Sequence, residues 1–233
     1  MARTLNPEAH AVRRDAFLDS AQRLIQVKGY EQTSVQDVLD DLETSKGAFY
    51  HYFDSKSALL DGVVERMVEG ALASAEPIVA ALDVPADAKL RGIFAATAAF
   101  KSARKEFLLA LIQVWLSDDN ALVRERFRRS VVLRLTPVIA AIIRQGRAEG
   151  VFTTTSSADD TTRVFVSLVL AANTTATELF LAHQARAVTF DDVRRALAAY
   201  AEGFERILGA APGSLPLLDE AVLQEWFDQE GVN

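Results

Sequence analysis

The sequence predicts an all-α protein. Apolar residues recur at helical spacing along nearly all of its 233 residues, and no convincing run alternates apolar and polar residues as a half-buried strand does. Half of the residues are apolar, which is enough to build a substantial core in one large domain or two coupled ones. The chain is therefore expected to fold as an assembly of packed helices.

Caps and breakers mark where the first helices begin and end. Asn6 can cap a helix that has proline at its first position, and Thr33-Ser34 and Ser55 stand at later helix starts. We expect helices from Pro7 to Gly29, from Val35 to about Leu42, from a cap at Thr44 or Ser45 to Phe53, and from Ser55 to about Leu82. Pro77 is expected to bend or weaken the last of these.

The remaining helices follow the same rules. Asp83-Val84-Pro85 opens one helix, another carries Phe107 and Leu111, and a long one runs from about Ala121 to Gly150 with a kink at Pro137. The pattern then predicts two apolar helices over 161–183 and 190–208. After Gly209 it predicts a linker and a short amphipathic helix with Leu218, Val222 and Trp226.

Composition excludes several kinds of chemistry. The chain has no Cys, and its three His residues lie far apart, so we expect no metal site and no cofactor. It also lacks a phosphate-binding loop and a nucleophile motif, which argues against an enzyme. No secretory signal is visible, and no apolar run approaches the roughly 18 residues that span a bilayer. We therefore expect a cytoplasmic protein without a membrane partner.

The predicted helix that starts at Thr44 or Ser45 has an unusual outer face. If Phe49 points inward, Gly47 and His51 lie nearly opposite it, with Ala48 and Tyr50 on the flanks. A face meant only for water would carry Lys, Glu or Gln, whereas small residues and hydrogen-bond donors suit a helix that enters a DNA groove. Together with the preceding short helix and tight turn, this pattern has the spacing of a helix-turn-helix. An ordinary helical interface is the alternative.

The stretch TSVQDVLDDLETSKGAFYHYFDSKSALL resembles the DNA-binding segment of the tetracycline-repressor-like (TetR/AcrR) family of bacterial regulators. Family members commonly have a Gly-Val-Ser turn where this chain has Leu42-Glu43-Thr44-Ser45. The resemblance implies a three-helix DNA-binding domain over 1–54, with its motif at about 34–53. A long fourth helix would join it to a ligand-binding and dimerisation domain over 55–210, and 211–233 would form a C-terminal extension.

The resemblance also implies which residues meet DNA. Phosphate contacts would come from Thr33, Lys46, Tyr50 and Lys56, which set the register of the protein on the duplex. The bases or the nearby backbone would be faced by Gln36, Gly47, Ala48 and His51, and Ser45 belongs to the same set. Residues 1–60 hold seven Lys or Arg and nine Asp or Glu, and the whole chain has a formal charge of −7. Attraction to DNA must therefore come from positioned groups rather than from net charge.

The two apolar helices near the C-terminus predict a homodimer. Their stripes are too apolar for a solvated surface, and two copies packed as a four-helix bundle would bury them. The core of a monomer is the alternative. The predicted interface comprises Phe165, Leu168, Val169, Ala172, Ala176, Leu179, Phe180, Leu197, Tyr200 and Phe204.

A second stripe on the helix over 161–183 predicts a small-molecule site. Val166, Leu170, Asn173 and Thr177 place two polar groups on an apolar face, which suits a ligand pocket. Candidate opposite walls are Phe94, Phe107, Leu111 and Trp115, although aromatic residues at helical spacing also fit a plain core.

These patterns together predict a homodimeric repressor that releases operator DNA when a largely apolar small molecule binds. Arg128 and Arg134 are candidates for neutralising an acidic effector, or are part of a solvated face. The alternative function is a ligand-binding or protein-interaction module that does not read DNA.

Overall fold

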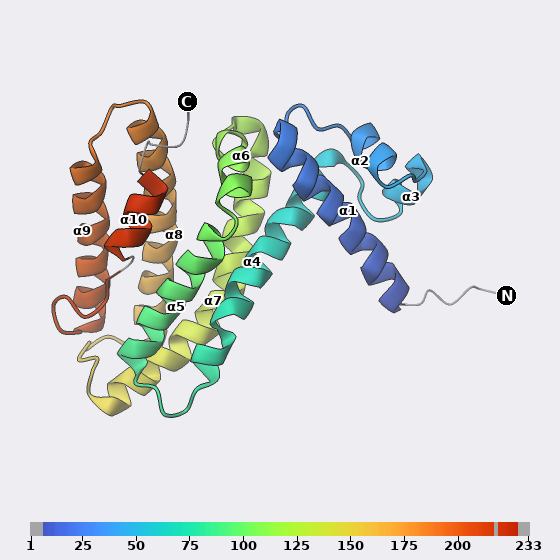
Figure 1. Cartoon of the computed structure of the whole chain (residues 1–233). Coiled ribbons are helices and arrows are strands. Elements are labelled where there is room, and N and C mark those ends of the chain that lie inside the picture. The colour runs from blue at the N-terminus through green and yellow to red at the C-terminus, as the bar shows by residue number, and fades with distance from the viewer. Residues whose placement is uncertain (1–6, 217–218, 228–233) are drawn as a thin grey trace. The chain divides into compact units, whose positions relative to one another are not determined.

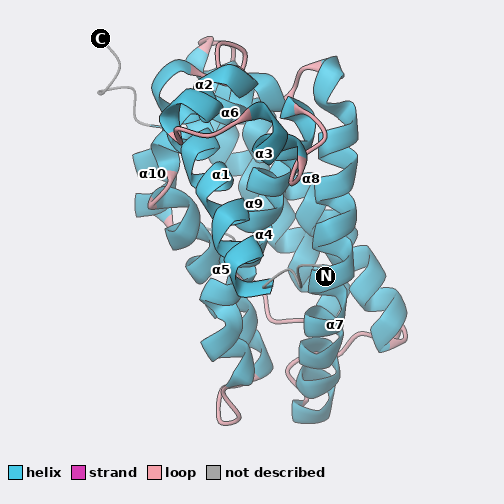
Figure 2. Cartoon of the chain, turned by 90° about the vertical axis from the view of Figure 1, so that its right-hand side faces the viewer, coloured by secondary structure: helices cyan, strands magenta, loops and turns pink. Residues whose placement is uncertain are grey.

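The computed structural model describes residues 7–216 and 219–227, and every regular element in these ranges is helical (Figures 1 and 2). The predicted all-α fold is confirmed. Its elements are α1 (Pro7–Lys28), α2 (Val35–Asp41), α3 (Lys46–Tyr50), α4 (Lys56–Ala80), α5 (Ala86–Ser102), α6 (Lys105–Trp115), a 3₁₀ turn (Asp118–Asn120), α7 (Ala121–Glu149), α8 (Ala158–Gln184), α9 (Phe190–Leu208) and α10 (Glu220–Phe227).

Helix ends agree with the predicted caps at most positions. Ser34 starts α2 in a reciprocal capping box with Asp37, and the Ser55 hydroxyl accepts a hydrogen bond from Ala58 N at the start of α4. Thr189, which is not among the predicted caps, starts α9 in a capping box with Asp192. Helices α4 and α7 continue through Pro77 and Pro137, as expected, and the bend and kink expected at these residues stay predictions. The predicted cap of α1, Asn6, lies outside the described residues.

The described chain divides into two compact units. Unit 1 comprises Met1–Glu69 with Arg104–Ser130, and unit 2 comprises Gly70–Ala103 with Val131–Asn233. The chain passes between the units three times, inside α4, between α5 and α6, and inside α7. These units group the chain differently from the predicted domains, because α6 and the start of α7 belong with the helix-turn-helix. The division into functional domains stays a prediction.

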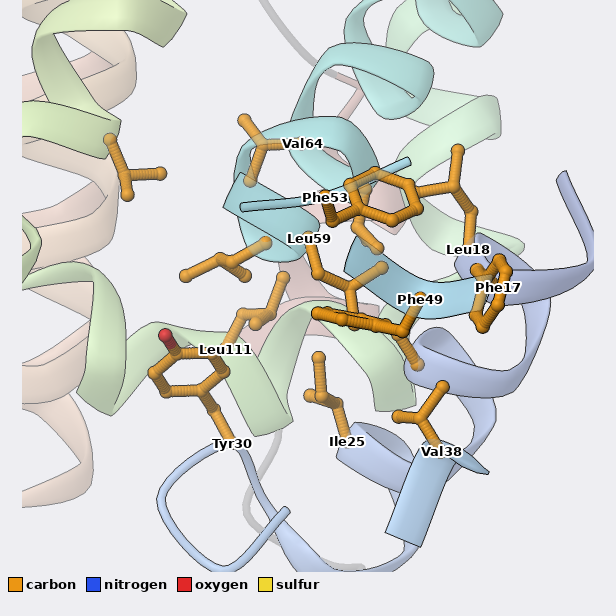
Figure 3. Close-up of a cluster of buried hydrophobic side chains, with 14 of the residues drawn as sticks. Phe17, Leu18, Ile25, Tyr30, Val38, Phe49, Phe53, Leu59, Val64 and Leu111 are labelled. Atoms are coloured by element: carbon orange, nitrogen blue, oxygen red, sulfur yellow. The ribbon is translucent and has the colours of Figure 1, made fainter. Parts of the chain in front are cut away.

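The core of unit 1 joins α6 to the three N-terminal helices and α4. Phe107 and Leu111 of α6 are buried in the same apolar cluster as Ile25 and Tyr30. Figure 3 shows Leu111 directed at this cluster. A side-chain hydrogen bond of 2.6 Å from Gln26 Nε2 to Glu106 Oε2 also ties α1 to α6.

The core of unit 2 is built around three phenylalanine rings. Phe165 of α8 and Phe204 of α9 are 4.6 Å apart between ring centroids, and Phe94 of α5 lies 5.6 Å from Phe204. Both Phe165 and Phe204 have no exposed surface within the single chain. They cannot therefore contact a second copy, and their predicted place in a dimer interface is wrong.

Three further residues of the predicted interface are largely covered within the single chain, and their role at an interface stays a prediction. Ala172, Phe180 and Leu197 are each less than a tenth exposed within the single chain. Part of the stripe is covered by the chain's own helices, because Phe165 and Phe204 pack with Phe94 of α5 and Phe180 packs with Phe227 of α10. The half-buried members of the predicted interface are Leu168, Val169, Ala176, Leu179 and Tyr200, and their role at an interface stays a prediction.

The predicted C-terminal amphipathic helix corresponds to α10, whereas Leu218 lies outside the described residues. Trp226 Nε1 donates a hydrogen bond of 2.9 Å to Ser102 Oγ at the end of α5. The ring of Phe227 lies 5.8 Å from that of Phe180 on α8. These contacts make α10 part of the core of unit 2 rather than an independent tail.

Helix α8 is the one described helix long and apolar enough, by length and composition, to cross a membrane. Only 22% of its most apolar window is buried inside the chain, so much of this uncharged surface is open. Its outward side includes Val164, which is 52% exposed, and Ala171. Helix α9 lies beside it, as Figure 1 shows, and exposes Ala198 and Ala199.

Candidate nucleic-acid interface

The turn between α2 and α3 has a defined geometry although it lacks glycine. Glu43 follows the last residues of α2 with φ +47°, in the left-handed region that usually holds Gly. Its backbone N–H donates to Asp40 O at 3.2 Å, and the N–H of Thr44 donates to Leu39 O at 2.9 Å. These two bonds are those of a Schellman motif, so the unusual sequence keeps an ordinary helix-ending turn.

This conformation predicts that Glu43→Gly stabilises unit 1. A side chain with a Cβ is disfavoured at positive φ, and part of the gain is lost to the greater freedom of Gly in the unfolded chain. We expect a net increase in unfolding free energy of about 0.5–1 kcal/mol. Urea denaturation measures it, with Glu43→Ala as the control because it removes the carboxylate but keeps the Cβ. An equal gain from both variants would assign the effect to charge instead of backbone conformation.

Helix α3 begins at Ser45, which resolves the choice between Thr44 and Ser45. The Ser45 hydroxyl accepts a hydrogen bond from Ala48 N at 3.2 Å and so caps the helix. Thr44 has another role, because its hydroxyl accepts a bond of 2.8 Å from Arg13 Nη2 of α1. The turn is thereby fixed to the first helix.

Phe49 anchors α3 to the rest of unit 1. It has no exposed surface, and its ring centroid lies 5.7 Å from that of Phe17 and 5.8 Å from that of Phe53. Figure 3 shows Phe49 in the middle of the cluster, with side chains of α1 and α2 around it. A helix of five residues has little stability of its own, so this ring holds it in place.

The opposite side of α3 is open to solvent, as predicted. Lys46, Gly47, Tyr50 and His51 are all exposed, and Ala48 is half-buried. A Cβ built on Gly47 would meet nothing nearer than Ser45 Oγ at 3.9 Å, so the packing of this chain does not require glycine there. The small residue leaves room on the outer side of the helix.

The other residues predicted to contact DNA differ in how exposed their side chains are. Gln36 is exposed on α2, and its amide donates to Asp40 Oδ1 at 2.7 Å. Thr33 is only 4% exposed, and its hydroxyl donates to Gly29 O at 2.7 Å. A buried, already bonded hydroxyl does not reach a phosphate, so the predicted contact from the Thr33 side chain is wrong for this conformation.

Lys56 is turned toward the protein. Its Nζ lies 4.1 Å from the centroid of the Tyr30 ring and donates to Glu31 O at 3.3 Å. Burial lowers the pKa of Lys56, with the Glu31 and Asp37 carboxylates acting in the opposite direction. Its contact with phosphate therefore stays a prediction that requires the side chain to swing outward.

Sequence patterns did not indicate His10. Its ring lies 4.6 Å from the Tyr52 ring and 5.6 Å from the His51 ring, measured between centroids, at the end of α3. His10 thus helps to position the exposed imidazole of His51. His10 lies in α1 and His51 follows the last residue of α3, 41 positions later, so no periodicity relates them.

The residues predicted to bind an effector are not brought together in one unit. Phe107, Leu111 and Trp115 belong to the core of unit 1, where the Trp115 ring lies 5.0 Å from that of Phe127. Val166 and Phe94 belong to the core of unit 2. The half-buried residues on α8 are Leu170, Asn173 and Thr177. Together with Val166 and Phe94 they lie in unit 2, so these five residues could form one site.

Comparisons with known proteins agree with this geometry. The family model described as bacterial regulatory proteins of the tetR family matches residues 17–63, which include α2 and α3. An uncharacterised helix-turn-helix transcriptional regulator of Lactococcus lactis is 41% identical over 56 residues, which are 24% of this chain and 29% of that protein. The regulator EthR of Mycolicibacterium smegmatis is 29% identical over 144 residues, 54% of this chain and 66% of that protein.

The match to these two curated relatives spans less than two thirds of their length. Over a longer range, the fold is similar to the crystal structure of a putative tetR-family regulator from Shewanella sp. PV-4, with a TM-score of 0.53. That similarity covers 82% of this chain and 97% of the other, and the 18% identity makes it a similarity of fold. Residues 17–63 therefore match the model of bacterial regulatory proteins of the tetR family, and the chain shares its fold with a putative regulator of that family.

Proposed function

We propose that this protein is a cytoplasmic repressor that binds operator DNA as a homodimer and releases it when a small molecule binds unit 2. The observation that carries the proposal is the two-sided character of α3. Phe49 locks one side into the core, and Gly47, Tyr50 and His51 form an open, small and hydrogen-bonding surface on the other. Such a surface fits the major groove, where backbone contacts set the register and base edges supply specificity.

The turn before α3 supports DNA reading over the alternative module that does not bind DNA. That alternative rested on the sequence Leu42-Glu43-Thr44-Ser45, which departs from the family's usual turn. With Glu43 in the left-handed conformation, the two backbone bonds of the turn form regardless of the side chain. The departure therefore gives no reason to expect a displaced α3.

The open side of α8 and α9 supports the proposed homodimer. Residues 164–177 of α8 carry no charged side chain, and much of this helix is uncovered in the single chain. The neighbouring α9 exposes Ala198 and Ala199 between charged residues, including Arg195 and Glu202. Those charges do not suit lipid, whereas a second copy with the same uncharged strip would cover it. Two copies would also present two α3 helices to a two-fold operator.

The release mechanism we propose uses the continuity of the helices. Helices α4 and α7 each contribute residues to both units, so a change in unit 2 is transmitted to unit 1 through covalent, hydrogen-bonded segments. An effector that binds more tightly to one arrangement than to another shifts the population between them. The free energy of this shift is set by the difference between the effector's binding free energies for the two arrangements.

Gly47→Ala tests whether the open side of α3 reads DNA. Nothing in the chain crowds a Cβ at this position, and Ala favours a helix over Gly by about 1 kcal/mol, so the variant should be as stable as the parent or more stable. A methyl group on a surface that meets a groove should nevertheless weaken operator binding, by about tenfold or more. Melting curves and footprinting on DNA that flanks the gene give the two measurements.

The interpretation depends on both readouts. Full operator affinity in a stable Gly47→Ala protein would show that α3 does not enter the groove closely. Absence of any salt-dependent footprint with the parent protein would contradict DNA binding itself, since phosphate contacts make affinity fall as salt rises.

A further inference from the structure

A lysine in unit 2 has no anionic partner among the residues that the structure describes. Lys101, in the last turn of α5, is half-buried, and its Nζ donates a hydrogen bond of 2.7 Å to Asn173 Oδ1 of α8. No described Asp or Glu side chain forms an ion pair with it. Desolvation lowers the pKa of the Lys101 ammonium, and no nearby carboxylate offsets this effect.

Other buried or half-buried cations among the described residues have partners that account for their position. Lys89 is 6% exposed, and its Nζ donates to Val79 O at 3.2 Å, where it satisfies a carbonyl in the last turn of α4. Arg91 pairs with Asp87 at 2.7 Å. The Lys89 ammonium also interacts with the Glu149 carboxylate. No described carboxylate acts on the Lys101 ammonium, whose acceptor is a neutral amide. A shielded charge without a counter-charge is costly, which makes this position suited to an anion from outside the chain.

The residues around Lys101 and Asn173 indicate the chemical character of the remainder of such an anion. Residues 92–100 of α5, which lead to Lys101, include no charged side chain, and neither do residues 164–177 of α8 around Asn173. Leu170 lies one helical turn before Asn173 on α8. On the other side, Trp226 of α10 bonds to Ser102, the neighbour of Lys101. A molecule that reaches the ammonium would therefore lie along helix surfaces that carry no charge.

We propose that Lys101 and Asn173 bind the carboxylate of an apolar organic acid, and that an acid of this class is the effector. The identification as an effector rests on the proposed function, whereas binding of the acid does not. The Lys101 ammonium supplies the charge, and the Asn173 amide nitrogen supplies a second donor. Thr177 is excluded from this set, because its hydroxyl donates to the backbone oxygen of Asn173 at 3.0 Å.

Matched acids and alcohols test the inference. Calorimetric titration of the full chain with 1-naphthoate and decanoate should show saturable binding. The corresponding alcohols, 1-naphthalenemethanol and decanol, should bind at least about tenfold more weakly because they lack the charge. Lys101→Met should weaken binding of the acids by about 10- to 100-fold and leave the alcohols unchanged. Arg163→Met is the control, since it removes an exposed cation of α8 that pairs with Asp160.

Asn173→Asp provides a second test with a nearly isosteric change. The new carboxylate would lie beside the Lys101 ammonium and neutralise it from within the chain. We expect a higher melting temperature and a loss of acid binding similar to that of Lys101→Met. This variant keeps the inference testable even if Lys101→Met folds poorly, because it adds a partner instead of removing one.

Three results would overturn the inference: equal affinity for acids and alcohols, no saturable binding of either acid at millimolar concentration, or unchanged acid affinity in Asn173→Asp. Because these titrations contain no DNA, they fail or succeed independently of operator binding. Footprinting with and without 1-naphthoate then asks the regulatory question. A neutral compound that releases operator DNA equally from the parent and Lys101→Met proteins would support the proposed function while rejecting an acidic effector.

Discussion

Phe204→Asp is expected to unfold unit 2 rather than to release folded monomers. Phe204 has no exposed surface and lies against Phe165 and Phe94. Removal of a buried aromatic ring costs about 3–5 kcal/mol, and an unpaired carboxylate in the same place adds a desolvation penalty. The sum is comparable to the whole stability of a typical domain, about 5–15 kcal/mol. Circular dichroism and sedimentation velocity should show lost helix and an expanded or aggregated chain.

Ala199→Asp is the matched control on the same helix. Ala199 is exposed in the single chain, so a carboxylate there stays in water and the fold should be retained. In the proposed homodimer this residue lies on the covered side of α9, and the charge should shift the protein toward a folded monomer. A folded, monomeric Phe204→Asp protein would contradict the core described here and restore Phe204 to the interface.

The corrected interface shows what helical periodicity can and cannot establish. The spacing of Phe165, Phe204 and Leu197 correctly placed apolar stripes on two long helices. Periodicity does not reveal what covers a stripe, and here Phe94 of α5 supplies part of the cover. The open side of α8 is instead marked by Val164 and Ala171, which are too small and too few to stand out in a sequence that is apolar nearly all round.

The placement of α6 could not be predicted for a related reason. Phe107 and Leu111 fit a ligand pocket or a core equally well by their spacing, and the structure puts them in the core of unit 1. The contact that joins them to that unit, such as the bond from Gln26 to Glu106, connects residues 80 positions apart. Local patterns carry no information about pairings at that range.

The helix-turn-helix was predictable because its determinants are local. Ser34 with Asp37, Ser45 with Ala48, and Phe49 with Phe53 all act within four residues of one another. The conformation of Glu43 is the exception, since a left-handed backbone at Glu is not apparent from its residue type. The position of His10 beside His51 is likewise a product of tertiary packing.

Phe49→Ala should abolish operator binding by releasing α3 from unit 1. The ring is completely buried, so its removal is expected to cost about 3–5 kcal/mol of unfolding free energy. Phe49 is the buried residue of this five-residue helix, so the variant would leave a cavity where α3 packs on unit 1. Tyr50→Ala is the control at the next position, where 47% of the residue is exposed. It should leave the melting temperature nearly unchanged and weaken binding to all DNA sequences alike, because phosphate contacts carry no sequence information.

Thermal melts and binding isotherms of the two variants separate anchoring from contact. In Phe49→Ala, lost stability and lost DNA binding should appear together, and hydrogen exchange at α3 should accelerate, because local opening exposes its amides. In Tyr50→Ala, affinity should fall, by about tenfold, while exchange at α3 is unchanged. If Phe49→Ala instead kept its stability and bound DNA normally, the buried ring would not position α3, and the reading surface would have to lie elsewhere on unit 1.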